Sequence, residues 1–167
     1  MLLETSLEDL YRTSVEAFPK TAMRQNATDT VVVDHLEWVP FQGVGTLFVK
    51  ATVKNEGRKN EAIILFKGVR YKEGRGRGVV PVSTNSGKTV FLEALSSKKT
   101  DVNVRCSCKD FQFRFNYYDH LDRSLFGRKR AKYEGVGLWL ANPSELPGMC
   151  KHLMKMTKAL SESGVLY

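Results

Sequence analysis

The chain has 167 residues, of which 42% are hydrophobic and 26% are charged, with 13 glycines, 5 prolines and 3 cysteines. This composition is typical of a globular protein, and the length suits one domain over residues 1–167. No apolar run approaches the roughly 20 residues of a membrane-spanning helix, and three cysteines are too few for a disulfide scaffold. The start of the chain, Met1–Glu4, lacks the basic region of a signal peptide. We therefore expect a cytoplasmic protein, and we exclude membrane-spanning, small disulfide-rich and fibrous proteins.

The formal net charge of +8 is unevenly distributed. Residues 1–49 carry 3 basic and 7 acidic side chains, whereas residues 50–105 carry 13 basic and 5 acidic ones. An acidic head followed by a basic body favours contact with a polyanion or with a neighbouring subunit of complementary charge. A solvated surface without a partner is the alternative, because a net charge of about 2–8 is common in small domains.

The first predicted element is an amphipathic helix over residues 6–18. Thr5 and Glu8 have the spacing of a capping box, and apolar side chains recur at helical intervals until Pro19 ends the pattern. A connecting loop is expected over residues 19–29.

Strands are predicted over residues 31–39, 45–54 and 61–69, with a break at 40–43 and a hairpin turn at 55–58. The second strand alternates between apolar and polar residues, which is typical of a strand with one buried face. Its expected buried residues are Leu47, Val49, Ala51 and Val53.

Shorter strands are predicted over residues 79–82, 89–95 and 101–106. The alternation of aromatic and polar residues over 111–117 predicts a further strand, with Phe111, Phe113 and Phe115 on its core face. Base stacking by these rings is the alternative.

A loop is expected over residues 121–140. A short terminal helix follows at 148–161, with Leu153, Met156 and Leu160 on one face. The predicted fold class is α+β, a β-rich core with an N-terminal and a C-terminal helix.

All three cysteines and one histidine form two short-range pairs, Cys106–Cys108 and Cys150–His152. Zinc prefers four cysteine and histidine ligands in a tetrahedron, and two such pairs supply that set. Residues i and i+2 of an extended strand point to the same side, so the first pair can bind one ion. The second pair lies at the start of the terminal helix, whose N–H groups stabilise a thiolate.

Three alternatives stay open for these residues. The thiols could be inert buried side chains, with His152 on the surface. Cys106 and Cys108 could instead form a redox pair that Cys150 resolves. A soft metal other than zinc would also suit the ligand set.

The C-x-C…C-x-H pattern resembles the SWIM-type zinc finger, which carries these ligands on a β-strand–helix unit. The resemblance covers residues 106–152 and implies a zinc-binding unit within 101–160, with Cys106, Cys108, Cys150 and His152 as ligands. The fold would then be α+β with a zinc-finger-like C-terminal part. The 41-residue spacer, 109–149, is longer than usual and contains Trp139. The resemblance implies a closed structural site that often contacts nucleic acid or protein, and it does not imply catalysis.

Two further stretches, VRCSCKDFQFRFNYYDH and NPSELPGMCKHL, are similar to segments of uncharacterised structural proteins of tailed bacteriophages. This similarity implies a virion subunit of the neck, tail or baseplate, assembled in the host cytoplasm. Its partners would be other virion proteins, with no membrane and no small-molecule substrate.

A nucleic-acid-binding zinc finger is the alternative function. The Gly/Arg loop at 73–78 contains Arg75 and Arg77, and the loop at 121–140 contains Arg128, Lys129 and Arg130. Basic side chains of this kind contact phosphates. A hairpin tip is the favoured explanation of the Gly/Arg loop, and a solvated loop explains Arg128–Arg130 equally well.

The chain carries no serine–histidine–aspartate arrangement, paired-carboxylate motif or HExxH motif. Asn85–Thr89 imitates the end of a phosphate-binding loop, but the required glycine is replaced by Val82, so a polar turn is expected. A zinc site with four protein ligands leaves no position for substrate. We therefore predict that the protein is not an enzyme.

Overall fold

A computed structural model describes residues 4–17, 30–134 and 142–167. The helical elements are α1 (Leu7–Ala17), the 3-10 turn η2 (Gln42–Val44), the π-helical turn η3 (Phe111–Phe115), α3 (Asn116–Leu121) and α4 (Lys151–Glu162). The strands are β1 (Val31–Phe41), β2 (Thr46–Asn55), β3 (Arg58–Phe66), β4 (Tyr71–Lys72), β5 (Val79–Ser83), β6 (Thr89–Glu93) and β7 (Val102–Cys106). The loop predicted at 19–29, Trp139 and the end of the loop predicted at 121–140 lie outside the described residues.

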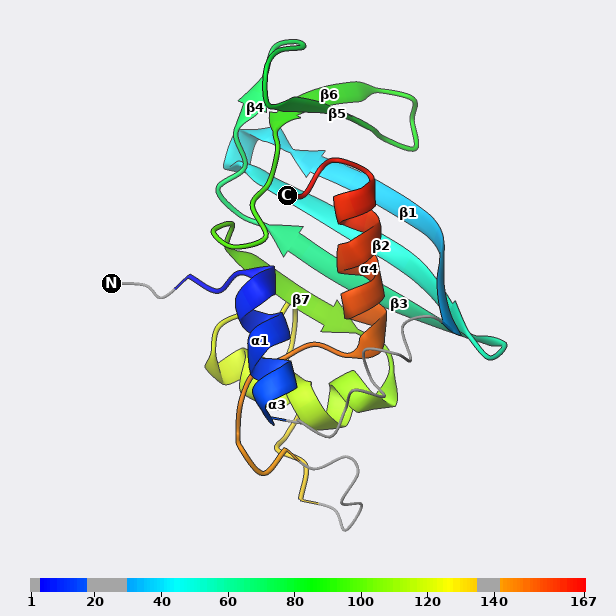
Figure 1. Ribbon diagram of the computed structural model, residues 1–167, viewed down its shortest axis with the longest axis vertical. Coiled ribbons are helices and arrows are strands. Elements are labelled where there is room, and N and C mark those ends of the chain that lie inside the picture. Colours follow the sequence, from blue (N-terminus) through cyan, green and yellow to red (C-terminus); the bar gives the residue numbers. More distant parts are fainter. Residues whose placement is uncertain (1–3, 18–29, 135–141) are drawn as a thin grey trace.

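The strands form two antiparallel sheets, one of four strands in the order β1-β2-β3-β7 and one of three in the order β4-β6-β5. Helix α4 lies across one face of the larger sheet and contacts all four of its strands (Figure 1). Helix α1 lies beside it, near β7 (Figure 1). The predicted α+β class, with a helix near each end of a β-rich core, is confirmed.

The core lies between the larger sheet and α4. Strand β2 alternates as predicted, and its four inward residues are completely buried: Leu47, Val49, Ala51 and Val53. The predicted inner face of the terminal helix is also completely buried: Leu153, Met156 and Leu160. Burial of each large aliphatic side chain contributes about 1.5–3 kcal/mol. This contact therefore fixes α4, and with it the second half of the Cys/His pattern, on the sheet.

Strands β2 and β3 are joined by the predicted hairpin turn. Asn55 pairs with Arg58, and the two residues between them, Glu56 and Gly57, have φ values of 50° and 78°. Two left-handed residues form the two-residue turn whose twist matches that of the flanking strands. The turn places Arg58 and its neighbour Lys59 at the end of the sheet.

The prediction of a strand over residues 111–117 is wrong, because this segment is helical in η3 and α3. Phe111 and Phe115, four residues apart, are completely buried, with ring centroids 6.5 Å apart. Phe113 lies apart from them against Tyr133, at 5.2 Å between centroids. A period of two and a helical step of four both place Phe111 and Phe115 on one face, so the pattern did not distinguish the two structures.

The boundaries of other elements differ from the predictions by a few residues. Strand β4 was not predicted, and α4 begins at Lys151 rather than at residue 148 because Cys150 is its N-cap, in an extended conformation. The loop after α3 is confirmed for residues 122–134, where Leu125 makes only an isolated bridge to Val104. The turn predicted around Asn85–Thr89 is confirmed between β5 and β6.

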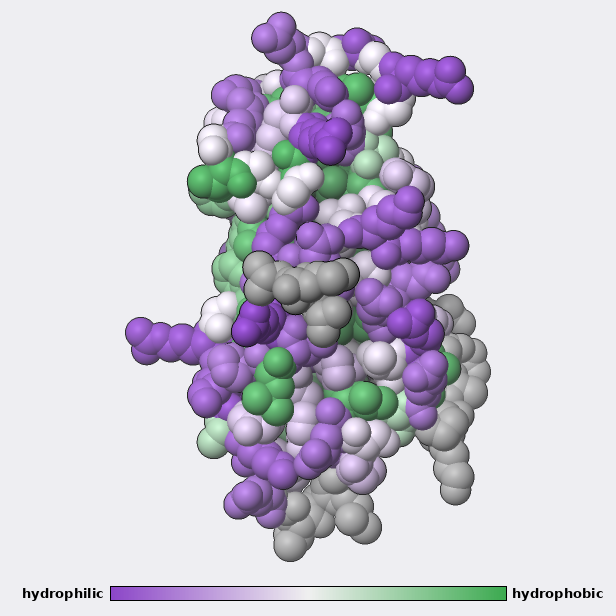
Figure 2. All heavy atoms as spheres, turned by 90° about the vertical axis from the view of Figure 1, so that its left-hand side faces the viewer, coloured by the Kyte–Doolittle hydropathy of each residue, from purple (hydrophilic) through white to green (hydrophobic). Residues whose placement is uncertain are grey.

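Hydrophilic side chains cover most of the face turned to the left of Figure 1, and hydrophobic ones form small separate groups there (Figure 2). Among the described residues, no helix combines the length and the apolar character needed to cross a membrane.

Candidate metal centre

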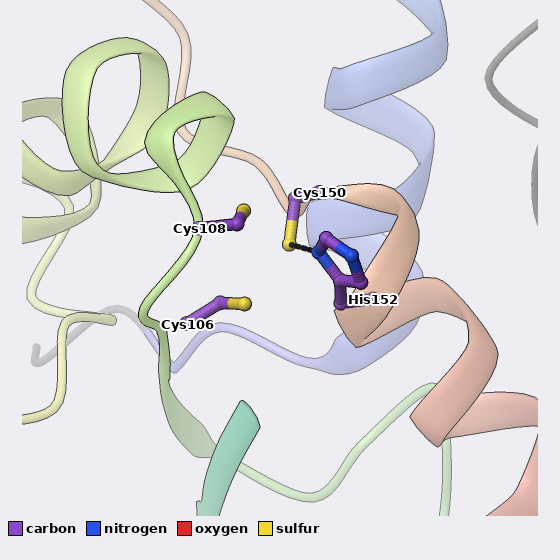
Figure 3. Close-up of side chains that lie close together, drawn as sticks. All are labelled: Cys106, Cys108, Cys150 and His152. Atoms are coloured by element: carbon purple, nitrogen blue, oxygen red, sulfur yellow. Dashed lines mark hydrogen bonds between the residues drawn. The ribbon is translucent and has the colours of Figure 1, made fainter. Parts of the chain in front are cut away.

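The structure brings together the four residues of the Cys-x-Cys and Cys-x-His pairs, although 41 residues separate the two pairs in the chain. Their side chains converge from the end of β7 and the start of α4 (Figure 3). All four are buried, and their ligand atoms lie within 4.8 Å of one another. Three thiols and one imidazole in this arrangement could hold a metal ion.

The first pair is positioned by the pairing of β7 with β3. Cys106 is the last residue of β7 and lies on its inner face, opposite Ala62. The backbone N–H of the next residue, Ser107, donates to the carbonyl of Glu61 at 3.0 Å, and the N–H of Glu61 donates to Ser107 Oγ at 2.9 Å. These bonds extend the strand pairing by one residue, so Cys108 leaves the sheet at a defined point.

The second pair is positioned by contacts that precede α4. The N–H of Gly148 donates to Asp119 Oδ1 at 2.8 Å, and the N–H of Met149 donates to Ser14 Oγ at 2.8 Å. Cys150 then caps the helix, and His152 lies in its first turn. Helices α1 and α3 therefore hold the backbone that leads into the ligands.

The thiols of the cluster differ in acidity. A hydrogen bond from the Cys106 thiol lowers the pKa of Cys108, with further bonds from the Cys150 thiol and from the N–H of Phe111, which lies 3.3 Å from Cys108 Sγ. The same bond to Cys108 raises the pKa of Cys106, and burial raises the pKa of Cys150. The hydrogen bonds within the cluster therefore favour the thiolate form of Cys108.

The four ligand atoms lie within 4.8 Å of one another and would move closer by up to about 1 Å to bind a tetrahedral zinc ion. Zn–S bonds of about 2.3 Å and Zn–N bonds of about 2.0–2.1 Å imply ligand separations of about 3.6–3.8 Å. Cys150 Sγ and His152 Nδ1 are 3.8 Å apart, so Nδ1 is the nitrogen that faces the thiols. The other nitrogen, Nε2, is buried without a hydrogen-bond partner among the described residues.

Three polar residues that support the site were not predicted from the sequence. Ser14 and Asp119 are buried and bond the backbone before Cys150, and Asn142 donates to the carbonyl of Arg114 at 3.1 Å and to that of Leu146 at 2.7 Å. Two features of the sequence could have indicated a role for Ser14 and Asn142. Ser14 lies on the apolar face of the first predicted helix, and Asn142 precedes a proline in a turn.

The basic residues predicted to contact nucleic acid do not form one surface. Arg75 and Arg77 lie in the exposed loop between β4 and β5, at the end of the molecule opposite α3 (Figure 1). The guanidinium of Arg130 lies over the Phe113 ring, 4.9 Å from its centroid, and donates to Gln112 Oε1. The neighbouring basic residues, Arg128 and Lys129, are exposed.

No family model, curated protein or solved structure matches this chain. The case for a metal centre therefore depends on the residues of the chain itself and on their geometry.

Proposed function

We propose that this chain is a structural subunit of a tailed-phage particle, that one zinc ion at the Cys/His cluster stabilises its fold, and that it is not an enzyme. The observation that carries the zinc centre is the burial of three thiols and one imidazole within 4.8 Å of one another. Four protein ligands complete the coordination of zinc, so the ion has a structural role and no position for substrate.

Zinc binding would supply stabilising free energy that the 109–149 spacer does not obtain from strand pairing. In the described part of the 109–149 spacer, no strand follows α3, so few backbone bonds tie its later residues to the sheet. Structural zinc binding contributes on the order of 10 kcal/mol in small sites, whereas closing a loop of this length costs only a few kcal/mol. The ion would join β7 to α4 directly.

Metal content tests the zinc centre. The protein is purified without chelator, and zinc per chain is measured by elemental mass spectrometry together with the number of reactive thiols. We expect about one zinc per chain, with the cysteines protected until a chelator is added.

Two histidine variants provide the matched comparison. His152→Ala should lose zinc and melt at a lower temperature, whereas His35→Ala, at an exposed position on β1, should retain both properties. Zinc-free protein with freely reactive thiols would overturn the proposed centre.

An apolar hollow supports the assembly role. It lies on the face of the larger sheet opposite α4, since Phe48 and Leu65 alternate with buried neighbours. The hollow has a volume of about 520 Å³, and its lining includes Val39, Phe41, Val44, Phe48, Leu65 and Phe126. Exposed apolar surfaces of this kind mark contacts with other proteins.

Particle composition tests the assembly role. Tailed-phage particles are purified on a density gradient from the host that makes this chain, and their peptides are identified by mass spectrometry. We expect the chain at a constant ratio to the other virion proteins. Its recovery only outside the particle fractions would contradict the assembly role without affecting the zinc result.

Nucleic-acid binding by a SWIM-type zinc finger is the second candidate function. The observation that favours it is a group of four basic side chains beside the Cys/His cluster, none of which has an ion-pair partner among the described residues.

A further inference from the structure

A depression of about 620 Å³ lies directly beside the Cys/His cluster. Three segments that are distant in the sequence form it: the β2–β3 hairpin, the residues after β7, and the start of α4. Cys108 and His152 belong to its lining, so the candidate metal centre lies at its wall. Its volume is within the range of about 300–1,000 Å³ that is usual for ligand pockets.

The depression has an excess of positive charge. Among the described residues, its basic side chains are those of Arg58, Lys59, Lys109 and Lys151. Two carboxylates also line it, and one of them, Asp110, is 3.4 Å from the guanidinium of Arg114. Glu56 is therefore the one lining carboxylate without an ion-pair partner among the described residues.

The metal centre does not cancel this excess. Three thiolates and one divalent ion would carry a net charge of −1, and Glu56 adds another negative charge. Four cations still exceed these two charges, so the depression attracts anions with the centre loaded.

The polar groups that remain available in the depression are mainly donors. Ser107 Oγ donates to Asn60 Oδ1 at 3.1 Å, so the side-chain oxygen of Asn60 is already engaged and its amide N–H groups are donors. A ligand that only accepts hydrogen bonds, as phosphate oxygens do, is complementary to this lining.

The lining also distinguishes among the possible polyanions. Among the described residues that line the depression, none has an aliphatic or aromatic side chain apart from those of the Cys/His cluster. Protein interfaces depend on such anchors, and single-stranded nucleic acids bind through bases stacked on aromatic rings. Contacts to phosphates alone are sufficient for a duplex, whose bases stay paired.

We propose that this basic depression binds the phosphate backbone of a double-stranded nucleic acid without reading its sequence. The site differs from the basic residues expected from the sequence, Arg75, Arg77 and Arg128–Arg130. It goes beyond the proposed role in a particle and deepens the second candidate function, because it rests on the same four basic side chains and names the kind of nucleic acid that they would bind.

Fluorescence anisotropy with a short labelled DNA duplex tests the proposal at several salt concentrations. The test variant is Lys59→Gln/Lys109→Gln, which removes one cation from each of two segments of the depression. The matched control is Lys98→Gln/Lys99→Gln, two exposed lysines before β7 that have the same charge and are distant from the depression. Zinc per chain is measured for every variant.

We expect the Lys59→Gln/Lys109→Gln variant to bind about tenfold more weakly and to reduce the log–log salt slope by about 1–2. The Lys98→Gln/Lys99→Gln control should stay within about twofold of the parent, and two unrelated duplex sequences should bind equally. Equal losses in the two variants, or no loss in either, would overturn the proposal. A single strand that binds more tightly than the duplex would also contradict it.

Glu56→Gln provides a second test in the opposite direction. It removes the unpaired carboxylate of the depression, so we expect duplex binding to strengthen severalfold. Unchanged or weaker binding would count against the site, even if the lysine variant had lost its fold. Zinc-free protein would contradict the proposed metal centre, whereas the anisotropy comparison reports on the depression separately.

Discussion

The backbone N–H of Gly148 donates a hydrogen bond to Asp119 Oδ1 at 2.8 Å in the protein interior. Asp119 belongs to α3, which follows the first pair of ligands, and Gly148 lies two residues before Cys150. This bond therefore links the two halves of the candidate metal centre through a contact that contains no ligand.

The space around Gly148 excludes a side chain. A Cβ atom there would lie 2.6 Å from Phe115 Cε1 and closer still to Ser14 Oγ. We predict that Gly148→Ala lowers the free energy of unfolding by about 1–3 kcal/mol, the usual cost of overpacking, and weakens metal retention. Denaturant unfolding and zinc analysis measure the two effects.

Gly43→Ala is the matched control, because a Cβ at Gly43 would meet no atom within 4 Å. Equal stability of the Gly148→Ala and Gly43→Ala proteins would show that the space around Gly148 accommodates a Cβ atom and would contradict the prediction.

Asp119 makes stability depend on pH. Burial raises the pKa of its carboxyl group well above the ordinary value, although the bond from Gly148 opposes the shift. The unfolded chain releases this proton at a lower pH than the folded chain does, so the contribution of Asp119 to stability falls as pH rises above about 4. Its second oxygen, Oδ2, has no hydrogen-bond partner among the described residues.

We predict that Asp119→Asn retains the acceptor for Gly148 and removes the cost of a buried charge. The variant should be more stable than the parent by about 1 kcal/mol or more at pH 8, and this advantage should shrink toward pH 4. Unfolding of both zinc-loaded proteins at several pH values gives the difference. An advantage that stays constant with pH would contradict the titration of Asp119.

The helical structure of residues 111–121 predicts unequal roles for two phenylalanines. Phe111 is completely buried, whereas Phe113 is partly exposed and packs on Tyr133. Phe111→Ala should cost about 3–5 kcal/mol, and Phe113→Ala about 1 kcal/mol. Urea unfolding of the two variants measures the costs, and similar values would favour a strand, in which the two rings share one face.

The β2–β3 hairpin contains a residue in an unfavourable conformation. Glu56 has a φ of 50°, a left-handed value that costs non-glycine residues about 1 kcal/mol and that asparagine tolerates better. We predict that Glu56→Asn stabilises the protein by about 0.5–1 kcal/mol in thermal unfolding. Glu73→Asn, at an exposed loop position without a left-handed φ, is the control and should change little.

Local patterns in the sequence determined much of the fold. The alternation along β2, the apolar face of α4 and the Asn55–Arg58 turn each depend on neighbouring residues, and the structure confirms all three. The ligand spacing, two residues within each pair, is also local. It therefore identified the four side chains that the structure brings together.

Contacts between residues far apart in the chain decided three features that no local sequence pattern contains. Phe111 and Phe115 fit a strand and a helix equally well. The helix buries these two rings and places Phe113 apart from them against Tyr133, whereas a strand would put all three rings on one face. The two ligand pairs meet because distant residues such as Ser14 and Asp119 hold the backbone before Cys150. The basic depression is formed by three segments whose proximity depends on sheet pairing and helix packing, which are contacts between residues far apart in the chain.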